Sequence, residues 1–359
     1  MNKDQKASYL RTILLFTYSL IGIGLLMNFS ISPAASNSLS LNIFYRQLLY
    51  VGIGTFFLIF FTYFNHKKLK NVSTVLFFLL VASLLLVLIK GEGAHRLIDI
   101  GLPFTFQPSQ YANLILTILI AKVVSEKSKE EYNQEIFIIL FLIVIFVSGL
   151  VAIEPDMGDA AIIFLTNITL LFICGIKTRD FFMVLTPTSV LGVIAVLYRD
   201  KWKQRIVYFF HPHQSPLDAG YQALQSFRAI ARGGVTGAGF MRSIFKYGDL
   251  PENTSDFIFA IIGEEFGIIG CILLITLFVV LLYTGFKIVK NAESSFSRLL
   301  AAGIMLNIAT ASIVNISTNI GLLPVTGIVL PFISYGGNSM LSNLIGIGII
   351  MNIVRTNGE

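Results

Sequence analysis

The chain has few charged residues for its length. Only 13% of its 359 residues are Asp, Glu, Lys or Arg, against roughly 25% in soluble proteins. Hydrophobic residues make up 55% of the chain, and the mean hydropathy is +0.78. The composition therefore excludes an ordinary soluble domain and predicts a polytopic membrane protein.

Cysteine and histidine are also scarce. The two cysteines, Cys174 and Cys271, lie in apolar runs, which argues against a disulfide framework and a cysteine-based metal site. His211 and His213 are two residues apart, but no Cys or carboxylate stands at ligand spacing. We therefore expect no metal site in the chain. The basic residues sit beside apolar runs, so the net charge of +6 indicates contact with anionic lipids and not with nucleic acid.

Ten apolar runs are long enough to cross a membrane, because a spanning helix needs about 20 residues. These predicted spans are 11–30, 42–64, 71–90, 107–124, 136–153, 158–176, 181–198, 256–286, 298–318 and 333–354. The first run has no small-residue cleavage site, so it is not expected to be a signal peptide. No internal repeat or second domain is visible. The prediction is one all-α membrane domain over residues 1–359.

The flanking charges predict how the domain is oriented. One set of loops, together with the two ends of the chain, holds fifteen of the 26 Lys and Arg residues, and cationic loops stay cytoplasmic. Both termini are therefore expected in the cytoplasm. The loop from about 199 to 255, between spans seven and eight, carries eight Lys and Arg residues. Long loops are translocated largely regardless of charge, so this loop is expected outside.

The large outer loop begins with a basic and aromatic stretch, residues 199–205. This stretch fits a membrane-surface anchor, with Trp202 and Tyr208 in the headgroup region. It equally fits attraction of a diphosphate, and one surface can do both. Residues 221–231 have helical spacing with a partly apolar face, which predicts an interfacial helix.

Four glycines follow that helix, among them Gly234 and Gly237. Glycine lets backbone N–H groups approach a phosphate closely. No Gly-Lys-Ser/Thr follows, so the spacing is not that of a P-loop. A flexible surface loop is the favoured interpretation, with phosphate binding as the alternative.

Two further segments with unusual composition are expected at the outer face. EPDMGDA, residues 154–160, places three acids between spans five and six. It is expected to be an exposed helix cap with Asp156 at the helix start, or a set of acids orienting cations or sugar hydroxyls at a cavity mouth. Residues 319–339 are apolar but interrupted by Pro324, Gly327, Pro331 and two more glycines. Irregular backbone at membrane depth must be buried in protein or line a wet cavity, so this segment is expected to wall a substrate cavity.

The stretch LPENTSDFIFAIIGEEFG, residues 250–267, is the most informative part of the chain. It places Asp256 where the outer loop meets an apolar run, and Glu264 and Glu265 inside that run. A carboxylate in hydrocarbon is costly and rarely lacks a function or a partner. At the boundary, Asp256 can touch both a lipid-anchored substrate and water, which suits a general base.

These segments together resemble the SEDS family, the polytopic peptidoglycan glycosyltransferases of bacterial shape, elongation, division and sporulation. The resemblance covers nearly the whole chain. It is strongest in FQPS at 106–109, PDMG at 155–158, GYQALQS at 220–226, residues 250–267 and GLLPVTGIVLPFISYGG at 321–337. Within the family, the division type is more similar than the elongation type in one feature, the motif SIFKYGDLPE followed by IIGEE. The short tails instead favour the elongation type. We lean to division.

The resemblance implies a ten-span fold in the bacterial cytoplasmic membrane, a lipid II substrate, a class B penicillin-binding protein as partner and other divisome or elongasome proteins. The family's catalytic aspartate falls on Asp256. No cofactor is expected in the chain, although a divalent cation can accompany the substrate diphosphate. The candidate cations for that diphosphate are Arg205, Arg232 and Lys246. The other substrate-binding positions in or beside the motifs are Arg96, Gln107, Ser109, Asp156, Gln225, Ser226, Gly234, Gly237, Glu252, Ser334 and Gly336.

The chain departs from the family pattern at several positions. Leu97 replaces the usual Trp after Arg96, Thr254-Ser255 replaces His-Thr, and Val329 replaces a Pro. Gln110 and Asn113 replace a Glu and a Lys of span four. Because positions i and i+3 share a helix face, the two amides are expected to substitute for an ion pair. The family's second-span Arg persists and then needs another partner. The expected structural polar residues inside the membrane are Arg46, Gln110, Asn113, Glu264 and Glu265.

Two other classes of function compete with the enzyme. A lipid II flippase would use the same cavity, with Glu264 and Glu265 coupling it to protons, but no inverted repeat is visible. A non-catalytic scaffold that activates a penicillin-binding protein is the second alternative.

Overall fold

The computed structural model describes residues 2–34, 40–90, 96–99, 105–127, 134–154, 156–198, 200–211, 219–248 and 250–358. Within these residues ten helices have 17 residues or more. They are α1 (Lys3–Ile31), α2 (Ser40–Tyr63), α3 (Lys67–Lys90), α4 (Ser109–Ser125), α5 (Gln134–Ile153), α6 (Met157–Ile173), α7 (Thr178–Tyr198), α10 (Ile258–Asn291), α11 (Ser295–Asn319) and α12 (Gly337–Thr356). His95, Pro155, Arg199 and His213 lie outside the described residues.

Each of the ten helices coincides with one predicted span. Seven of them, in the described part of the chain, are long and apolar enough to cross a membrane, namely α1, α2, α3, α5, α10, α11 and α12. Helices α4 and α6 are apolar but have 17 residues each. The chain is thus an all-helical, multi-span membrane protein, as its composition predicts.

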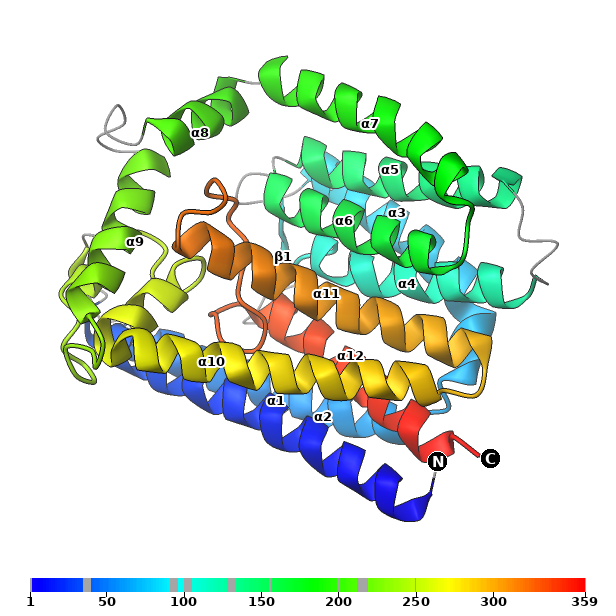
Figure 1. Ribbon diagram of the computed structural model, residues 1–359, viewed down its shortest axis with the longest axis horizontal. Coiled ribbons are helices and arrows are strands. Elements are labelled where there is room, and N and C mark those ends of the chain that lie inside the picture. Colours follow the sequence, from blue (N-terminus) through cyan, green and yellow to red (C-terminus); the bar gives the residue numbers. More distant parts are fainter. Residues whose placement is uncertain are drawn as a thin grey trace.

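Helices α11 and α12 form the centre of the bundle (Figure 1). Helix α11 packs on α10, α4 and α6, and α12 packs on α2 and α4. Helix α1 contacts α10 and α2. More than half of the most apolar window is buried in α11 and in α12. The two termini lie at the same end of the bundle (Figure 1), where Lys6 Nζ donates a hydrogen bond to Arg355 O at 3.2 Å.

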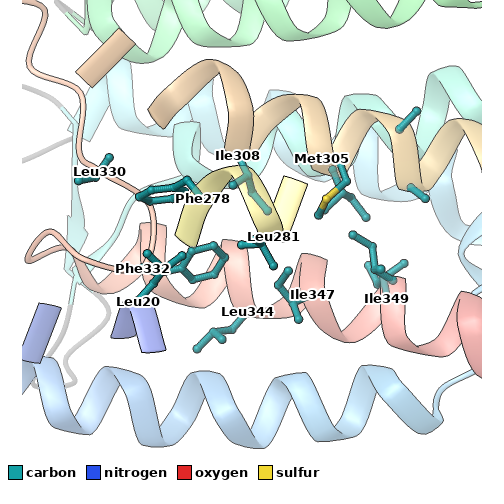
Figure 2. Packing of buried hydrophobic residues seen from close by; sticks show 14 of the residues in the cluster. Leu20, Phe278, Leu281, Met305, Ile308, Leu330, Phe332, Leu344, Ile347 and Ile349 are labelled. Carbon is teal, nitrogen blue, oxygen red and sulfur yellow. The ribbon is translucent and has the colours of Figure 1, made fainter. Parts of the chain in front are cut away.

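The core consists of interlocked aliphatic and aromatic side chains from α1, α10, α11, α12 and the segment that precedes α12. Figure 2 shows Phe278 and Leu281 of α10 close to Ile308 and Met305 of α11, with Leu344 of α12 below. All five side chains are at most 3% exposed. This packing fixes α10 and α11 against each other, and it therefore fixes the residues at the ends of these helices that lie opposite the termini.

The end of the bundle opposite the termini carries the irregular elements (Figure 1). They are η1 (Ser32–Ala34), the two-stranded antiparallel sheet of β1 (Ile98–Asp99) and β2 (Thr105–Phe106), α8 (Asp200–Phe210), α9 (Ala219–Gly233) and η3 (Phe245–Tyr247). Helix α9 confirms the helix predicted over 221–231. Helix α8 was not predicted, because its eleven residues are too basic to resemble a span and no start signal distinguishes them from a loop.

Helix α10 is broken at Gly267, whose φ of 67° and ψ of −166° are not helical. An unbroken helix would pair the N–H groups of Ile268 and Ile269 with the carbonyls of Glu264 and Glu265. Those N–H groups instead donate to Gly234 O at 3.0 Å and Val235 O at 3.2 Å. The carbonyls of Glu264 and Glu265 accept from the N–H groups of Ala238 and Gly239, at 2.9 and 3.0 Å. The loop after α9 thus replaces the missing hydrogen bonds of the span.

Candidate functional site

Asp256 lies in a tight turn two residues before α10. The carbonyl of Glu252 accepts the N–H groups of Ser255, Asp256 and Phe257 at 3.1–3.2 Å, and Glu252 has a positive φ of 53°. This turn orients the side chain of Asp256 before the regular helix begins. The Asp256 side chain is half-buried, whereas Phe257 behind it is fully buried.

Two amides of α11 hold the backbone of Asp256. Asn315 Nδ2 and Asn319 Nδ2 each donate to Asp256 O at 2.9 Å. Asn315 Nδ2 also donates to Ile328 O at 2.6 Å, and Asn319 Oδ1 accepts from the Ala260 N–H at 3.2 Å. Both asparagines are at most 1% exposed. Sequence analysis missed them, although two amides four residues apart inside an apolar run are a signal of buried polar contacts.

We expect Asn315→Ala to lower the rate of the reaction at Asp256 by about tenfold or more, because small displacements of a catalytic group cost up to about 10²-fold. The variant should have a lower kcat and an unchanged KM, since Asn315 binds the backbone of Asp256 and Ile328 and not the substrate. Asn307→Ala on the same helix is the control, because none of the described hydrogen bonds joins Asn307 to residues 250–257. Equal losses in the two variants would contradict this role of Asn315.

The segment before α12, which was predicted to wall a substrate cavity, lies against the turn that carries Asp256. Ser334 Oγ donates to Ser255 O, and the Tyr335 N–H donates to Thr254 O at 2.8 Å. A Cβ placed on Gly327, whose φ is 77°, would lie 3.5 Å from Asp256 Oδ2. The bare backbone of Gly327 therefore leaves room in front of the carboxylate. Gly336 directly precedes α12, and its N–H donates a long hydrogen bond of 3.4 Å to Gln47 Oε1.

The surroundings of Asp256 change its acidity. Burial raises its pKa to about 7, with smaller contributions from the negative charges of Glu252 and Asp156. Arg205 and a hydrogen bond from Ser255 act in the opposite direction. A pKa near neutrality is what a general base needs, because the group must be largely ionised and still accept a proton.

The acids between α5 and α6 form a second polar group near Asp256. Asp156 caps α6 by accepting the Asp159 N–H at 3.2 Å, as predicted, but it is 6% exposed and so is not an exposed cap. Arg96 Nη1 lies 3.6 Å from Asp156 Oδ2. Gln107 Nε2 donates to Asp156 Oδ2 at 3.3 Å, and Ser109 Oγ donates to Asp159 Oδ2 at 3.2 Å. The fold thus brings Arg96, Gln107, Ser109 and Asp156 together, although they come from three separate segments.

Glu154 is buried beside this group, and neither of its carboxylate oxygens has a hydrogen-bond partner among the residues that the structure describes. Its pKa is raised to about 8, mainly by burial and also by the charge of Asp156, while the charge of Arg96 acts in the opposite direction. Glu154 is therefore largely protonated at neutral pH, so the group carries less negative charge than its three acids suggest.

Arg205 of α8 is the cation that the structure places with Asp256. Its Nη1 donates to Val325 O at 3.3 Å, two residues from Gly327. Burial lowers the pKa of Arg205, while the charges of Asp256 and Asp156 raise it. Arginine stays charged under these conditions, so it supplies positive potential beside the carboxylate.

Arg232 and Lys246, which were predicted as diphosphate ligands, lie in a different cluster from Arg205 and Asp256. Lys246 Nζ pairs with Glu265 Oε1 at 3.1 Å and donates to Ser30 Oγ at 3.0 Å, and Lys246 is 3% exposed. Arg232 Nη1 pairs with Glu264 Oε1. Both cations are neutralised by the acids of α10. Likewise, neither Glu264 nor Glu265 is an unpaired carboxylate of the kind that a proton-coupled transporter would use.

The glycine loop is neither a phosphate cradle nor a free surface loop. A Cβ on Gly237 would collide with the carbonyl oxygen of Glu265. The N–H groups of Gly234 and Gly237 already donate to the carbonyls of Ala231 and Gly233, and the next two N–H groups donate to α10. These glycines therefore serve close packing of the loop against the broken helix.

The remaining predicted residues have structural contacts. Ser226 Oγ donates to Asn319 O at 2.9 Å, and buried Gln225 is 3.5 Å from Arg228 Nη1. Glu252 is exposed and accepts from Ser255 Oγ at 2.8 Å. Each of these three residues comes from the turn before α10 or from α9, the helix that packs on α10.

The two amides of α4 do not pair with each other as predicted. Gln110 Nε2 donates to Asp159 Oδ2, and Asn113 Oδ1 accepts from Asn167 Nδ2 at 2.8 Å. Each amide thus satisfies a group on α6. Arg46 is exposed on α2 and forms no ion pair among the described residues. The partner predicted for Arg46 is therefore not found in this part of the chain.

Comparison with known proteins identifies the family. Residues 11–359 match the family model described as "Cell cycle protein" for FtsW, RodA and SpoVE. The chain belongs to this SEDS family. It is 35% identical to stage V sporulation protein E of Bacillus subtilis and 35% identical to the probable peptidoglycan glycosyltransferase FtsW of Coxiella burnetii, covering 96% of both chains in each case. It is 34% identical to the peptidoglycan glycosyltransferase MrdB of Escherichia coli K12, over 73% of this chain and 71% of that protein.

Solved structures confirm the SEDS fold. A chain of a peptidoglycan synthase complex that coordinates polymerization and crosslinking superposes with a TM-score of 0.80 at 24% identity, over 96% of this chain and 97% of that one. The rod shape determining protein RodA of Thermus thermophilus superposes with a TM-score of 0.70 at 22% identity, over 97% of both chains. The similarity of division, shape and sporulation relatives leaves the subtype open.

Proposed function

We propose that this SEDS protein is a peptidoglycan glycosyltransferase that polymerises lipid II into glycan strands, with Asp256 as the general base. The observation that carries the proposal is the environment of Asp256. Its carboxylate has a pKa of about 7 and lies opposite the open backbone of Gly327, and the segment that carries Gly327 also binds Arg205. The names of the relatives from Coxiella burnetii and Escherichia coli support the same activity.

The chemistry follows from one base and a diphosphate leaving group. The 4-hydroxyl of a GlcNAc residue attacks the anomeric carbon of the donor, its proton passes to a carboxylate oxygen of Asp256, and the bond to the undecaprenyl diphosphate breaks. Direct displacement at an α-linked donor gives a β-1,4 product. The departing diphosphate needs positive charge, and Arg205 supplies it. Arg96 adds positive charge from the neighbouring acidic group.

The polar residues around Asp256, at the end of the bundle opposite the termini, support one orientation of the protein in the membrane. All ten long helices cross the bacterial cytoplasmic membrane, both termini are cytoplasmic, and residues 199–255 face outward. The common position of the termini at one end of the bundle supports an even number of spans (Figure 1). Within the family, the division type remains our assignment on the motifs of residues 243–265.

Cross-linking of the glycan strands is a separate reaction, and we assign it to partner proteins. A class B penicillin-binding protein cross-links the strands, and other divisome or elongasome proteins complete the assembly. The superposition on a chain of a synthase complex supports such a partnership. A divalent cation enters with the substrate diphosphate, and no step of the proposed proton transfer passes through it.

The direct test is synthesis of glycan strands from lipid II by the purified protein in detergent or liposomes, alone and with its penicillin-binding protein. Polymer in either reaction supports the proposal. Movement of lipid II across liposomes without any polymer would favour a flippase, and neither activity would favour a scaffold.

We expect the polymerisation rate to rise by about tenfold between pH 6 and pH 8 and to level off above that, because a base with a pKa near 7 goes from about one-tenth to about nine-tenths ionised over this interval. The sign follows from the raised pKa of Asp256, whose proton must leave before it can act. Rates measured at saturating lipid II provide the check. A rate that stays constant from pH 5.5 to 8.5 would mean that Asp256 is not the titrating base.

A further inference from the structure

An apolar groove runs between α8, α9 and residues 321–325 at the outer end of the bundle. Its walls are rings and aliphatic side chains, from Tyr208, Phe209, Ala223, Phe227, Leu323 and Pro324. The Phe227 ring packs so closely on Gly321 that any Cβ there would collide with it. Phe227 and Leu323 keep 36% and 38% of their surface exposed. The groove is thus a formed apolar surface that the protein leaves partly uncovered.

One lining residue of the groove carries a charge. Arg205 lies at the groove, and its guanidinium uses Nη1 to donate to Val325 O. None of the described carboxylates forms a salt bridge with it. A guanidinium presents five donors in a planar fork that suits phosphate oxygens. The groove therefore combines an apolar wall with a cation that is available for an anionic group.

The groove and the base are joined by one short stretch of backbone. Val325 lines the groove and accepts the bond from Arg205. Two residues later, Gly327 faces the carboxylate of Asp256. A molecule with its anionic group at Arg205 would therefore have an apolar tail on one side and Asp256 on the other.

We propose that this groove binds the first isoprene units of the lipid-linked donor, with the diphosphate at Arg205. The inference rests on the proposed function and adds to it a subsite for the lipid chain. The ligand is an isoprenyl diphosphate, because the groove requires an apolar chain attached directly to a strongly anionic head. A bilayer phospholipid shares part of this chemistry, and a helix of a partner protein could cover the same apolar wall, so the experiment includes both as outcomes.

The experiment uses a photoreactive farnesyl diphosphate carrying a diazirine on its chain, bound to the full-length protein in detergent. Cross-linked peptides are mapped by mass spectrometry. Labelling is expected in 205–209, 223–227 and 321–325. Ala223→Phe fills the groove and should reduce labelling, and raise the KM for lipid II, by about tenfold or more. Arg205→Gln should reduce labelling by a similar factor.

Phe210→Ala is the matched control for Phe209→Ala. The two rings are neighbours on α8, but Phe210 is 70% exposed and does not line the groove. Only Phe209→Ala should weaken labelling. Excess unlabelled farnesyl diphosphate should compete with the probe, whereas phosphatidylglycerol or farnesol should not. Competition by phosphatidylglycerol would overturn the proposal in favour of an ordinary lipid site.

Failure of this inference can be told apart from failure of the proposed function. If the protein polymerises lipid II but the probe labels other helices, or Ala223→Phe leaves KM unchanged, the groove proposal is wrong and the activity stands. If the groove is labelled as expected but no polymer forms, the subsite stands and the glycosyltransferase proposal falls. Loss of labelling only on addition of the penicillin-binding protein would show that the partner covers the groove, and it would overturn a donor subsite in the complex.

Discussion

Asp256→Asn should reduce formation of glycan polymer from lipid II by at least about 10²-fold, the lower range for loss of a general base. The amide has almost the same shape as the carboxylate but cannot accept a proton near neutral pH. The backbone carbonyl that Asn315 and Asn319 bind is unchanged by this substitution. The measurement is the initial rate of polymerisation by the purified variant, alongside its binding of lipid II.

The stability of the same variant should not fall. The folded pKa of Asp256 lies above its usual value, so the folded state loses stability as pH rises from about 4 through about 7. Asparagine removes that dependence, and the melting temperature at pH 8 should match or exceed that of the wild type. Glu126→Gln, which removes a carboxylate from an exposed pair with Lys70, is the control and should retain full activity. Near wild-type polymerisation by purified Asp256→Asn would refute the mechanism.

Lys246→Met should destabilise the protein by about 3–5 kcal/mol, because it leaves the carboxylate of Glu265 buried without its cation. Glu265 is 1% exposed, and within the described part of the chain its Oε2 already lacks a hydrogen-bond partner. Removing the ammonium also takes a donor from Ser30 Oγ, which links the C-terminal end of α1 to α10. Unfolding in mixed micelles, followed by a probe of helix content, measures the loss.

A second substitution separates buried charge from lost packing. Lys246→Met combined with Glu265→Gln removes both charges and should recover a large part of the stability, since an uncharged pair leaves no bare ion. Lys70→Met provides the matched control, because its partner Glu126 is 45% exposed and such pairs are worth about 1 kcal/mol or less. If the single and double variants are equally unstable, the ion pair is not the source of the effect.

The positions of the helices were predictable from the sequence because hydropathy is a local property. Each long apolar run forms a helix in the structure. Helix α10 begins at Ile258, so Asp256 lies at the boundary between the preceding loop and this helix. The irregular backbone before α12 was also predictable, since several prolines and glycines close together disfavour a regular helix.

The partners of polar residues were not predictable, because they depend on which segments meet. Lys246 and Arg232 looked like free cations until the fold placed the acids of α10 against them. The contact of Ser30 with Glu265 joins residues 235 positions apart. A glycine-rich composition fits a phosphate-binding loop and a closely packed loop equally well. The hydrogen bonds of this loop to the carbonyls of Glu264 and Glu265 identify it as the closely packed kind.

The break at Gly267 also has a consequence for the position of Asp256. When α10 enters the bilayer, the carbonyls of residues 264 and 265 and the N–H groups of residues 268 and 269 have no partner within the helix. Each such group costs several kcal/mol in hydrocarbon. The segment that satisfies them, residues 234–239, precedes α10 in the chain and comes from the loop after α9. With this break in place, the backbone of α10 is fully hydrogen-bonded only when residues 234–239 have docked against it, so the position of Asp256 just before α10 depends on that loop.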